Sequence, residues 1–243
     1  MDAWVLDESP GTYRWGTVGD PLPGRDEVQV RVVASALNQM DLWVTKGMPK
    51  PPLPHVPGCD VAGVVDAVGE EVTNVAVGDE VVINPGVSNA ALALARAMGA
   101  SVVVTSRNEA KRAQALKLGA DAAFDSADSR WPVEADVVVE SVGPATWEQS
   151  VRALKAGGRL VVCGGTSGPK VELNLPRLFF KQIEIIGSTM GSYEEFASLT
   201  NLVARGLPVQ VDGVFDLIDY PMALERLERC EQLGKIVLHH PVR

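Results

Sequence analysis

The middle of the sequence alternates short, largely apolar segments with segments that carry the start and stop signals of helices, and this alternation limits the fold more than any other feature. The segments 101–105, 136–140 and 183–186 read as strands buried on both faces of a sheet. Ser106 and Ser192 can each cap a following helix, because a Glu stands three residues after each of them. Gly157 and Gly158 are expected to end the helix that begins at Pro144. We therefore expect an α/β unit with a doubly wound parallel sheet.

The segments on either side of this middle have a different pattern. Glu27–Val32 alternates polar and apolar residues, as half-buried antiparallel strands do, and five prolines between residues 49 and 57 predict an irregular loop. The tail predicts a strand, a helix and a last strand at Lys235–Leu238. We expect head and tail to form one β-rich domain, residues 1–84 with 208–243, around an α/β domain of residues 85–207.

Composition excludes several classes of partner. The chain has 22 Lys and Arg against 31 Asp and Glu, and its net charge of −9 disfavours nucleic acid and anionic membranes. No apolar run is long enough to span a membrane, and no secretory signal opens the chain. Cys59, Cys163 and Cys230 are too few and too far apart for a disulfide framework or a structural zinc cluster. We expect a cytoplasmic protein that binds neither nucleic acid nor membrane.

The loop in which a dinucleotide's phosphates are expected is incomplete. Before the small-residue helix of residues 89–98, the sequence has only Gly86 where a dinucleotide fingerprint has three glycines. Gly86 can form a tight turn, but the glycine that lets the backbone approach a pyrophosphate is missing, and Pro85 lacks an N–H donor. An ordinary strand–turn–helix connection stays the alternative.

The end of the next predicted strand favours NADPH. Folds that bind NAD place an acidic residue here, whereas Thr105 is followed by Ser106 and Arg107, with Lys111 and Arg112 one turn later. In an acidic chain these cations predict a 2′-phosphate site formed by Ser106, Arg107 and Lys111. The alternative is that Ser106 only caps its helix and the cations form a solvated face.

Small residues follow other strands at the same predicted edge of the sheet. Cys163–Gly168 and Gly187–Gly191 are two such loops, and Gly143 follows the segment 136–140. Any one of these loops alone has the composition of an ordinary connection. Together at one edge of the sheet, their small residues allow a ligand to approach the backbone closely. The candidate cofactor-binding residues are Gly86, Ser106, Arg107, Lys111, Gly143, Gly165, Thr166, Ser188 and Thr189.

Motifs spread over nearly the whole chain occur in the order typical of one enzyme family. They are Leu37–Trp43, Pro57–Val65, Val77–Val82, Leu118–Asp121, Gly157–Leu160, Gly187–Ser188 and Lys235–Leu238. In these motifs the sequence resembles the medium-chain dehydrogenase/reductase superfamily, near its zinc-type alcohol dehydrogenase and quinone oxidoreductase branches. The resemblance implies a GroES-like β-rich domain beside a Rossmann domain. It also implies hydride transfer between NAD(P)H and a small carbonyl, alcohol, alkene or quinone-like substrate, with NADPH as the cofactor, NADH as the alternative, and a homodimer as the assembly.

One departure from the family concerns zinc. Zinc-dependent members have Cys at the position of Asn38 and His-Glu at Cys59-Asp60, so the resemblance is to the zinc-free branch and argues against a catalytic zinc. It implies that Asn38 positions a carbonyl substrate and that Asp41 supports it. A zinc-dependent alcohol dehydrogenase whose ligands lie in a missing segment stays an alternative.

A second departure is an apparent internal deletion near Gly86. Family members continue after the 81–83 strand through the rest of the catalytic domain and the first Rossmann strand, whereas here residue 83 runs almost directly into the helix that follows the fingerprint. The strand 80–83 is therefore needed by two sheets and can complete only one of them, which leaves the other with an open edge or a gap. A non-catalytic truncated remnant is the remaining alternative.

Overall fold

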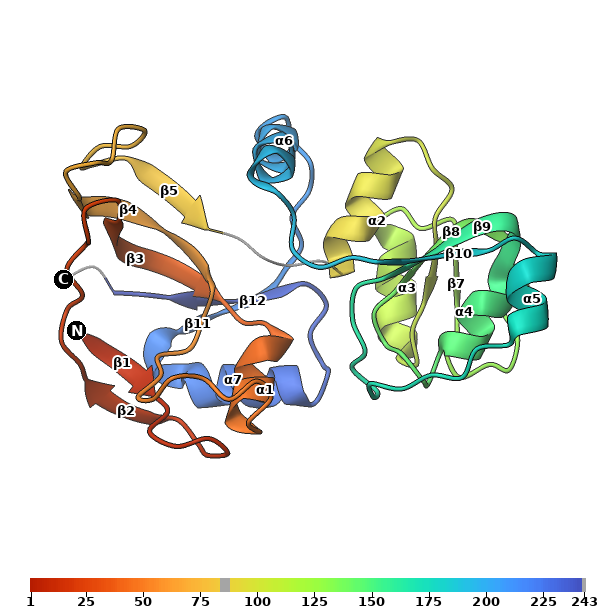
Figure 1. The fold of residues 1–243 in the computed structure, drawn as a ribbon, viewed down its shortest axis with the longest axis horizontal. Coiled ribbons are helices and arrows are strands. Elements are labelled where there is room, and N and C mark those ends of the chain that lie inside the picture. The colour runs from red at the N-terminus through yellow and green to blue at the C-terminus, as the bar shows by residue number, and fades with distance from the viewer. Residues whose placement is uncertain (84–87, 242–243) are drawn as a thin grey trace. The chain divides into compact units, whose positions relative to one another are not determined.

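A computed structural model describes residues 1–83 and 88–241 (Figure 1). The chain divides by its internal contacts into two compact units: unit 1 is Met1–Gly86 with Gln210–Arg243, and unit 2 is Val87–Val209. Gly86, and with it the predicted phosphate loop, lies outside the described residues. Within the described ranges, no helix is long and apolar enough to cross a membrane.

Unit 1 is mainly β-structure. Its strands are β1 (Asp2–Val5), β2 (Arg14–Thr17), β3 (Val28–Ala36), β4 (Asp60–Val68), β5 (Glu80–Ile83), β11 (Val211–Asp216) and β12 (Lys235–His239). Its helices are α1 (Gln39–Thr45) and α7 (Tyr220–Glu228), with a 3-10 turn at Leu217–Asp219. β1 and β2 form a separate antiparallel pair, and the other strands form one sheet in the order β11-β12-β3-β4-β5.

The pairing of β5 answers the question raised by the short sequence. β5 runs antiparallel to β4, with Val61 opposite Ile83 and Val64 opposite Glu80. The strand needed by two sheets therefore closes the edge of the unit 1 sheet. The core of this unit lies where α7 meets the sheet and comprises Leu37, Leu42, Tyr220, Ala223, Leu227, Ile236 and Leu238.

Unit 2 alternates strands and helices, as the sequence predicts. Its strands are β6 (Val103–Thr105), β7 (Ala122–Phe124), β8 (Ala135–Glu140), β9 (Leu154–Val162) and β10 (Glu184–Gly187). Its helices are α2 (Ser88–Ala97), α3 (Glu109–Lys117), α4 (Trp147–Ala153), α5 (Leu175–Phe180) and α6 (Tyr193–Ala204). The buried residues Trp147, Val151, Leu154, Leu160 and Ile183 form its core.

The strands of unit 2 do not form one sheet. β10, β9 and β8 pair in parallel in that order, and β6 pairs in parallel with β7 in a separate ladder. Within residues 88–209, no strand joins the two ladders. The gap expected for the sheet that lost the shared strand is therefore in unit 2.

Two local predictions about helices are wrong. Asn108, not Ser106, caps α3, because the Asn108 side chain accepts the hydrogen bond from the Lys111 N–H. α4 ends at Ala153 rather than at Gly157, because the chain turns extended at Leu154 and that fully buried leucine begins β9. The prediction for α6 is confirmed: Ser192 and Glu195 form the capping box at its start.

Candidate functional site

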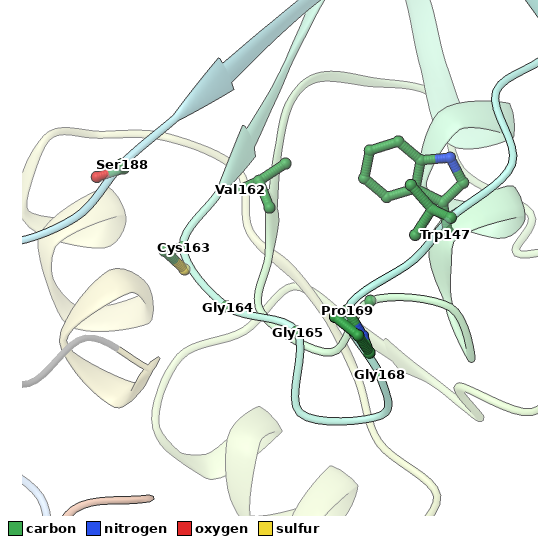
Figure 2. A pocket seen from close by; sticks show the side chains of 10 residues that line it. Trp147, Val162, Cys163, Gly164, Gly165, Gly168, Pro169 and Ser188 are labelled. Carbon is green, nitrogen blue, oxygen red and sulfur yellow. The ribbon is translucent and has the colours of Figure 1, made fainter. Parts of the chain in front are cut away.

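A cavity of about 530 Å³ lies at the carboxyl ends of the parallel strands β8, β9 and β10. Doubly wound sheets bind ligands at this edge, because the loops after successive strands converge there. Figure 2 shows Cys163, Gly164 and Gly165 following one another along the loop after β9, with Ser188 just beyond β10. The lining residues are Gly143, Trp147, Val162, Cys163, Gly164, Gly165, Gly168, Pro169, Val171 and Ser188.

Three of the predicted cofactor-binding residues meet in this cavity. Gly143, Gly165 and Ser188 come from three different loops and line the same space. Thr166 lies next to Gly165 without lining the cavity, and its hydroxyl donates a hydrogen bond to the Ser141 carbonyl at 3.5 Å. Thr189 is exposed and follows Ser188 without lining the cavity.

The walls of the cavity are backbone rather than side chain. Gly143 has φ +90°, and a Cβ on it would lie 3.1 Å from the Gly168 carbonyl oxygen, so no larger residue fits without strain. A Cβ on Gly165 would lie 2.9 Å from the same oxygen. These positions explain why the loops are glycine-rich, and they leave peptide groups open to a ligand.

The residues of the predicted 2′-phosphate site follow β6, and some of their side chains already make hydrogen bonds within the fold. The Arg112 guanidinium donates to the Ser106 carbonyl at 2.6 Å and to the Asp125 carboxylate at 2.9 Å, so it is committed to the fold. The Ser106 hydroxyl accepts from the Asn108 N–H at 3.2 Å. Arg107 is exposed, and no hydrogen bond or ion pair joins its side chain to the described part of the chain. Arg107 is therefore the available cation of the cluster.

Unit 1 contains a separate polar cluster around Asn38, which precedes α1. The Asn38 N–H donates to the Asp41 carboxylate at 2.7 Å, and the Asn38 amide group donates to the Cys59 sulfur at 3.5 Å. The Lys235 ammonium donates to the Asn38 side-chain oxygen and to the Asp60 carboxylate, each at 2.7 Å. The sequence motifs brought Asn38, Asp41, Cys59 and Asp60 to notice, and the fold brings them together.

Lys235 is the member of this cluster that the sequence did not reveal. It begins β12 and lies 175 positions from Asp60 along the chain. No local spacing links the two residues. The signal that could have found Lys235 is its place in the Lys235–Leu238 motif, because the tail strand lies beside β3 in the same sheet.

Burial changes the acid–base properties of the cluster. Burial raises the pKa of Asp41, with the negative charge of Asp60 adding to the rise, while the N–H groups of Asn38 and Gly58 and the Lys235 cation oppose it. Burial, followed by the charges of Asp60 and Asp41, also raises the pKa of the Cys59 thiol. The raised pKa disfavours the thiolate of Cys59, which is the form that binds metals.

The same residues bear on metal binding. Over residues 1–83 and 88–241, no group of three or more His, Cys, Asp or Glu side chains is arranged to hold a metal ion. At the positions where zinc-dependent proteins place ligands, Asn38 and Asp60 accept hydrogen bonds from Lys235. A zinc ion bound to these two side chains would lie next to the Lys235 ammonium, which carries a positive charge itself. These residues therefore do not fit a zinc ion.

Comparisons with known proteins agree with this two-part organisation. The family model of zinc-binding dehydrogenases matches residues 86–205, and the model of the alcohol dehydrogenase GroES-like domain matches residues 24–119. The matches run from the β-rich unit into the α/β unit and overlap over residues 86–119, next to the shared strand β5.

Similar proteins come from two enzyme types. The chain is 24% identical to a probable quinone oxidoreductase of Schizosaccharomyces pombe, over 90% of each chain. Its structure is similar to that of an NAD-dependent alcohol dehydrogenase, with 29% identity, a TM-score of 0.88, and coverage of 98% of this chain and 99% of the other. A thermostable alcohol dehydrogenase from Pyrobaculum aerophilum with cobalt and zinc bound has the same TM-score and coverage at 26% identity.

The comparison with the Schizosaccharomyces pombe protein also measures the deletion. The alignment extends over 296 positions, whereas this chain has 243 residues, so at least 53 positions (296 less 243) have no counterpart here. Because the alignment takes in 90% of each chain, these positions lie inside the aligned span. The architecture is therefore truncated internally.

Proposed function

The chain belongs to the medium-chain dehydrogenase/reductase superfamily, and from this premise we propose that it is an NADPH-dependent oxidoreductase acting on a small carbonyl, alkene or quinone-like substrate, or on the corresponding alcohol. The nicotinamide cofactor, when bound, supplies or accepts the hydride. The protein's own residues bind the cofactor and substrate, orient them and exclude water. The cavity at the ends of β8, β9 and β10 is the observation that carries this proposal.

The cavity fits the nicotinamide half of the cofactor. Its volume of about 530 Å³ is in the usual range for small-ligand sites. Gly143 and Gly165 present peptide groups without side chains in front of them, and Ser188 lines the cavity from the loop after β10. We assign Gly143, Gly165 and Ser188 to direct contact, with Thr166 and Thr189 supporting the same loops. Gly86 stays a prediction for the pyrophosphate.

Arg107 supports the preference for NADPH. A 2′-phosphate needs a cation that is exposed and not already paired, and Arg107 meets both conditions within the described residues, while Arg112 does not. No carboxylate follows β6 to accept the ribose hydroxyls of NADH, because Ser106 and Arg107 stand there. We assign the 2′-phosphate to Arg107, with Lys111 and Ser106 beside it.

Asn38 is the candidate for contact with substrate in unit 1. Its side-chain oxygen accepts from Lys235 and its side-chain nitrogen donates to Cys59, so the orientation of the amide is fixed at both ends, while Asp41 holds the backbone N–H. The amide nitrogen has two N–H groups. One donates a hydrogen bond to the Cys59 sulfur, and the other is left to donate to a substrate oxygen. Asp41 acts through Asn38 and is a positioning residue.

The test is cofactor binding by the full chain, measured by calorimetry with NADPH and NADH. We expect NADPH to bind at least about tenfold more tightly, because a charged hydrogen bond contributes about 1.5–3 kcal/mol. Arg107→Ser is expected to weaken NADPH about tenfold and to leave NADH unchanged. The matched control is Arg205→Ser, which removes another exposed arginine of unit 2 at the end of α6 and is expected to change neither value. Absence of NADPH binding at high micromolar concentration would refute the proposal.

Location, assembly and domain limits are parts of the same proposal. Within the described residues, Cys59, Cys163 and Cys230 form no disulfide, which supports a cytoplasmic location. All four residues of β10 are exposed, and within residues 1–83 and 88–241 no strand pairs with one of its edges, which supports a homodimer through that edge. We propose residues 1–84 with 208–243 as the catalytic domain and 85–207 as the nucleotide-binding domain. Light scattering at several concentrations tests the dimer.

A further inference from the structure

Glu140, the last residue of β8, is a buried carboxylate with an unusual environment. It is 3% exposed, and no Lys, Arg or His side chain pairs with it in the described part of the chain. Only neutral groups donate to it. A buried carboxylate without a cation is costly unless hydrogen bonds replace its hydration, so the arrangement of its donors indicates what it is kept for.

The donors divide between the two oxygens. Oε1 accepts from the Val142 N–H at 2.7 Å and from the Gly143 N–H at 3.0 Å. Oε2 accepts from the Ser150 hydroxyl, and the Thr146 hydroxyl lies 3.0 Å from both oxygens. One oxygen therefore holds the backbone of the turn after β8, and the other anchors the carboxylate to α4.

The turn that Glu140 holds is a wall of the cavity. Gly143 lines it, and its backbone packs so closely on the next loop that an added Cβ would lie 3.2 Å from the Gly165 Cα. The Val142 carbonyl accepts from the Ser167 N–H at 2.7 Å, which ties the turn to the loop after β9. A displacement of the turn would move both loops.

We propose that Glu140 is a positioning residue for the nicotinamide half of the cofactor: its Oε1 fixes the Val142–Gly143 peptides and, through them, the loop that carries Gly165. The inference rests on the proposed function. Glu140 does not touch the cavity, because it is absent from the lining. Glu140 therefore affects the shape of the cavity wall. It does not affect the proposed 2′-phosphate site, whose residues follow β6 in the other ladder.

The test uses two probes on the full chain: NADPH, which needs both halves of the site, and adenosine 2′,5′-bisphosphate, which needs only the phosphate side. Glu140→Leu leaves the Val142 and Gly143 N–H groups without an acceptor and is expected to weaken NADPH at least tenfold, with the bisphosphate changed less than twofold. Glu140→Gln keeps an acceptor oxygen for these groups and is expected to restore NADPH to within about threefold of the natural chain. Ser150→Ala, which removes only the donor to Oε2, is the matched control and is expected to bind both probes normally.

If Glu140→Leu does not fold, Glu140→Asp serves in its place, because a carboxylate one methylene shorter retracts from both N–H groups. Hydrogen exchange without nucleotide gives a second readout: the segments 141–146 and 163–168 are expected to exchange faster in the Leu or Asp variant. Unchanged binding of NADPH by the Leu variant, or by the Asp variant where that one is used, overturns the inference alone, and so does equal loss of the two probes. A natural chain that binds neither probe overturns the proposed function and the inference with it.

Discussion

The sheet of unit 1 runs without a break through β11-β12-β3-β4-β5, whereas the strands of unit 2 form one ladder of three and one of two. The difference traces to β5, which precedes α2 in the chain but pairs with β4. Within the described residues of unit 2, the outer edge of β8 has no partner strand. The five-stranded sheet of unit 1 is thus continuous, and the break expected from the internal deletion lies in unit 2.

Exposed valines occur on edge strands of both units, and Val82 on β5 and Val214 on β11 in unit 1 are 60% and 65% exposed. Val65 on β4 is 1% exposed, whereas Val137 and Val139 on β8 are 43% and 51% exposed. β8 is the strand at the edge left by the missing strand, and its valines contribute less burial than Val65 does on the inner strand β4. Hydrophobic stabilisation scales with the area removed from water. We infer that unit 2 has the smaller margin of stability, and the following substitutions test this difference between the units.

The largest effect is expected from truncating one core leucine in each unit. Leu160 is 0% exposed in unit 2, and Leu238 is 3% exposed in unit 1. Changing either to Ala is expected to cost about 2–5 kcal/mol, because the surrounding side chains close the cavity only in part. Hydrogen exchange followed by mass spectrometry reads the β8–β9 and β3–β4 peptides separately.

The outcome of this pair distinguishes the units. Leu160→Ala is expected to abolish protection of the β8–β9 peptides, while Leu238→Ala lowers protection of the β3–β4 peptides without abolishing it. If the β3–β4 peptides lose protection first, or if both units respond alike, unit 1 is not the more stable one and the split ladder has no energetic consequence.

The parts of the molecule that the sequence predicted are those encoded by local pattern. The apolar segments of β8 and β10 and the cap at Ser192 depend on neighbours a few residues away, and so they could be read directly. The glycine-rich loops indicated where the cavity lies, because parallel strands bring their carboxyl ends, and the loops that follow them, to one edge of the sheet.

Long-range contacts could not be read in this way. Glu140 ends an apolar segment like many strand-terminal acids, and only the fold shows that its carboxylate is buried against the following turn. Lys235 reaches Asn38 and Asp60 across 197 and 175 positions of sequence, with Nζ–Oδ distances of 2.7 Å to each. The choice of β5 between two sheets depended on the relative stability of two pairings, which no pattern in four residues can decide.

The next largest effect is expected at Lys235. Its partner Asp60 has a side chain only 10% exposed, and one of the Asp60 oxygens is buried with no hydrogen bond from the part of the chain that the structure describes. Lys235→Met leaves this carboxylate without a cation and is expected to destabilise unit 1 by about 1–3 kcal/mol, since a buried acceptor loses its partner.

The matched control for Lys235 is in unit 2. Lys155 pairs with Asp136 at 2.8 Å, but both side chains are exposed, by 44% and 80%. Lys155→Met is expected to change the free energy of unfolding by less than about 0.5 kcal/mol, because water screens such pairs. Urea titrations followed by peptide-resolved exchange compare the two variants. Equal losses would mean that burial of Asp60 does not matter.

The smallest effect is a difference in pH dependence between the units. The pKa of Asp41 in unit 1 is raised, first by burial, so the stability that this group contributes is fully present below its ordinary value of 3.8 and is lost as pH rises through the raised pKa. The pKa of Asp121 in unit 2 is lowered, first by the Val102 N–H, so its contribution is present above 3.8 and is lost as pH falls through the lowered pKa. Asp41→Asn and Asp121→Asn are therefore expected to change the slope of stability against pH in opposite directions, each in its own unit. Unfolding measured between pH 3 and 7 (about the range where carboxyl groups titrate) tests this, and slopes changed in the same direction would show that the Asp41 carboxylate is not held in an unfavourable site.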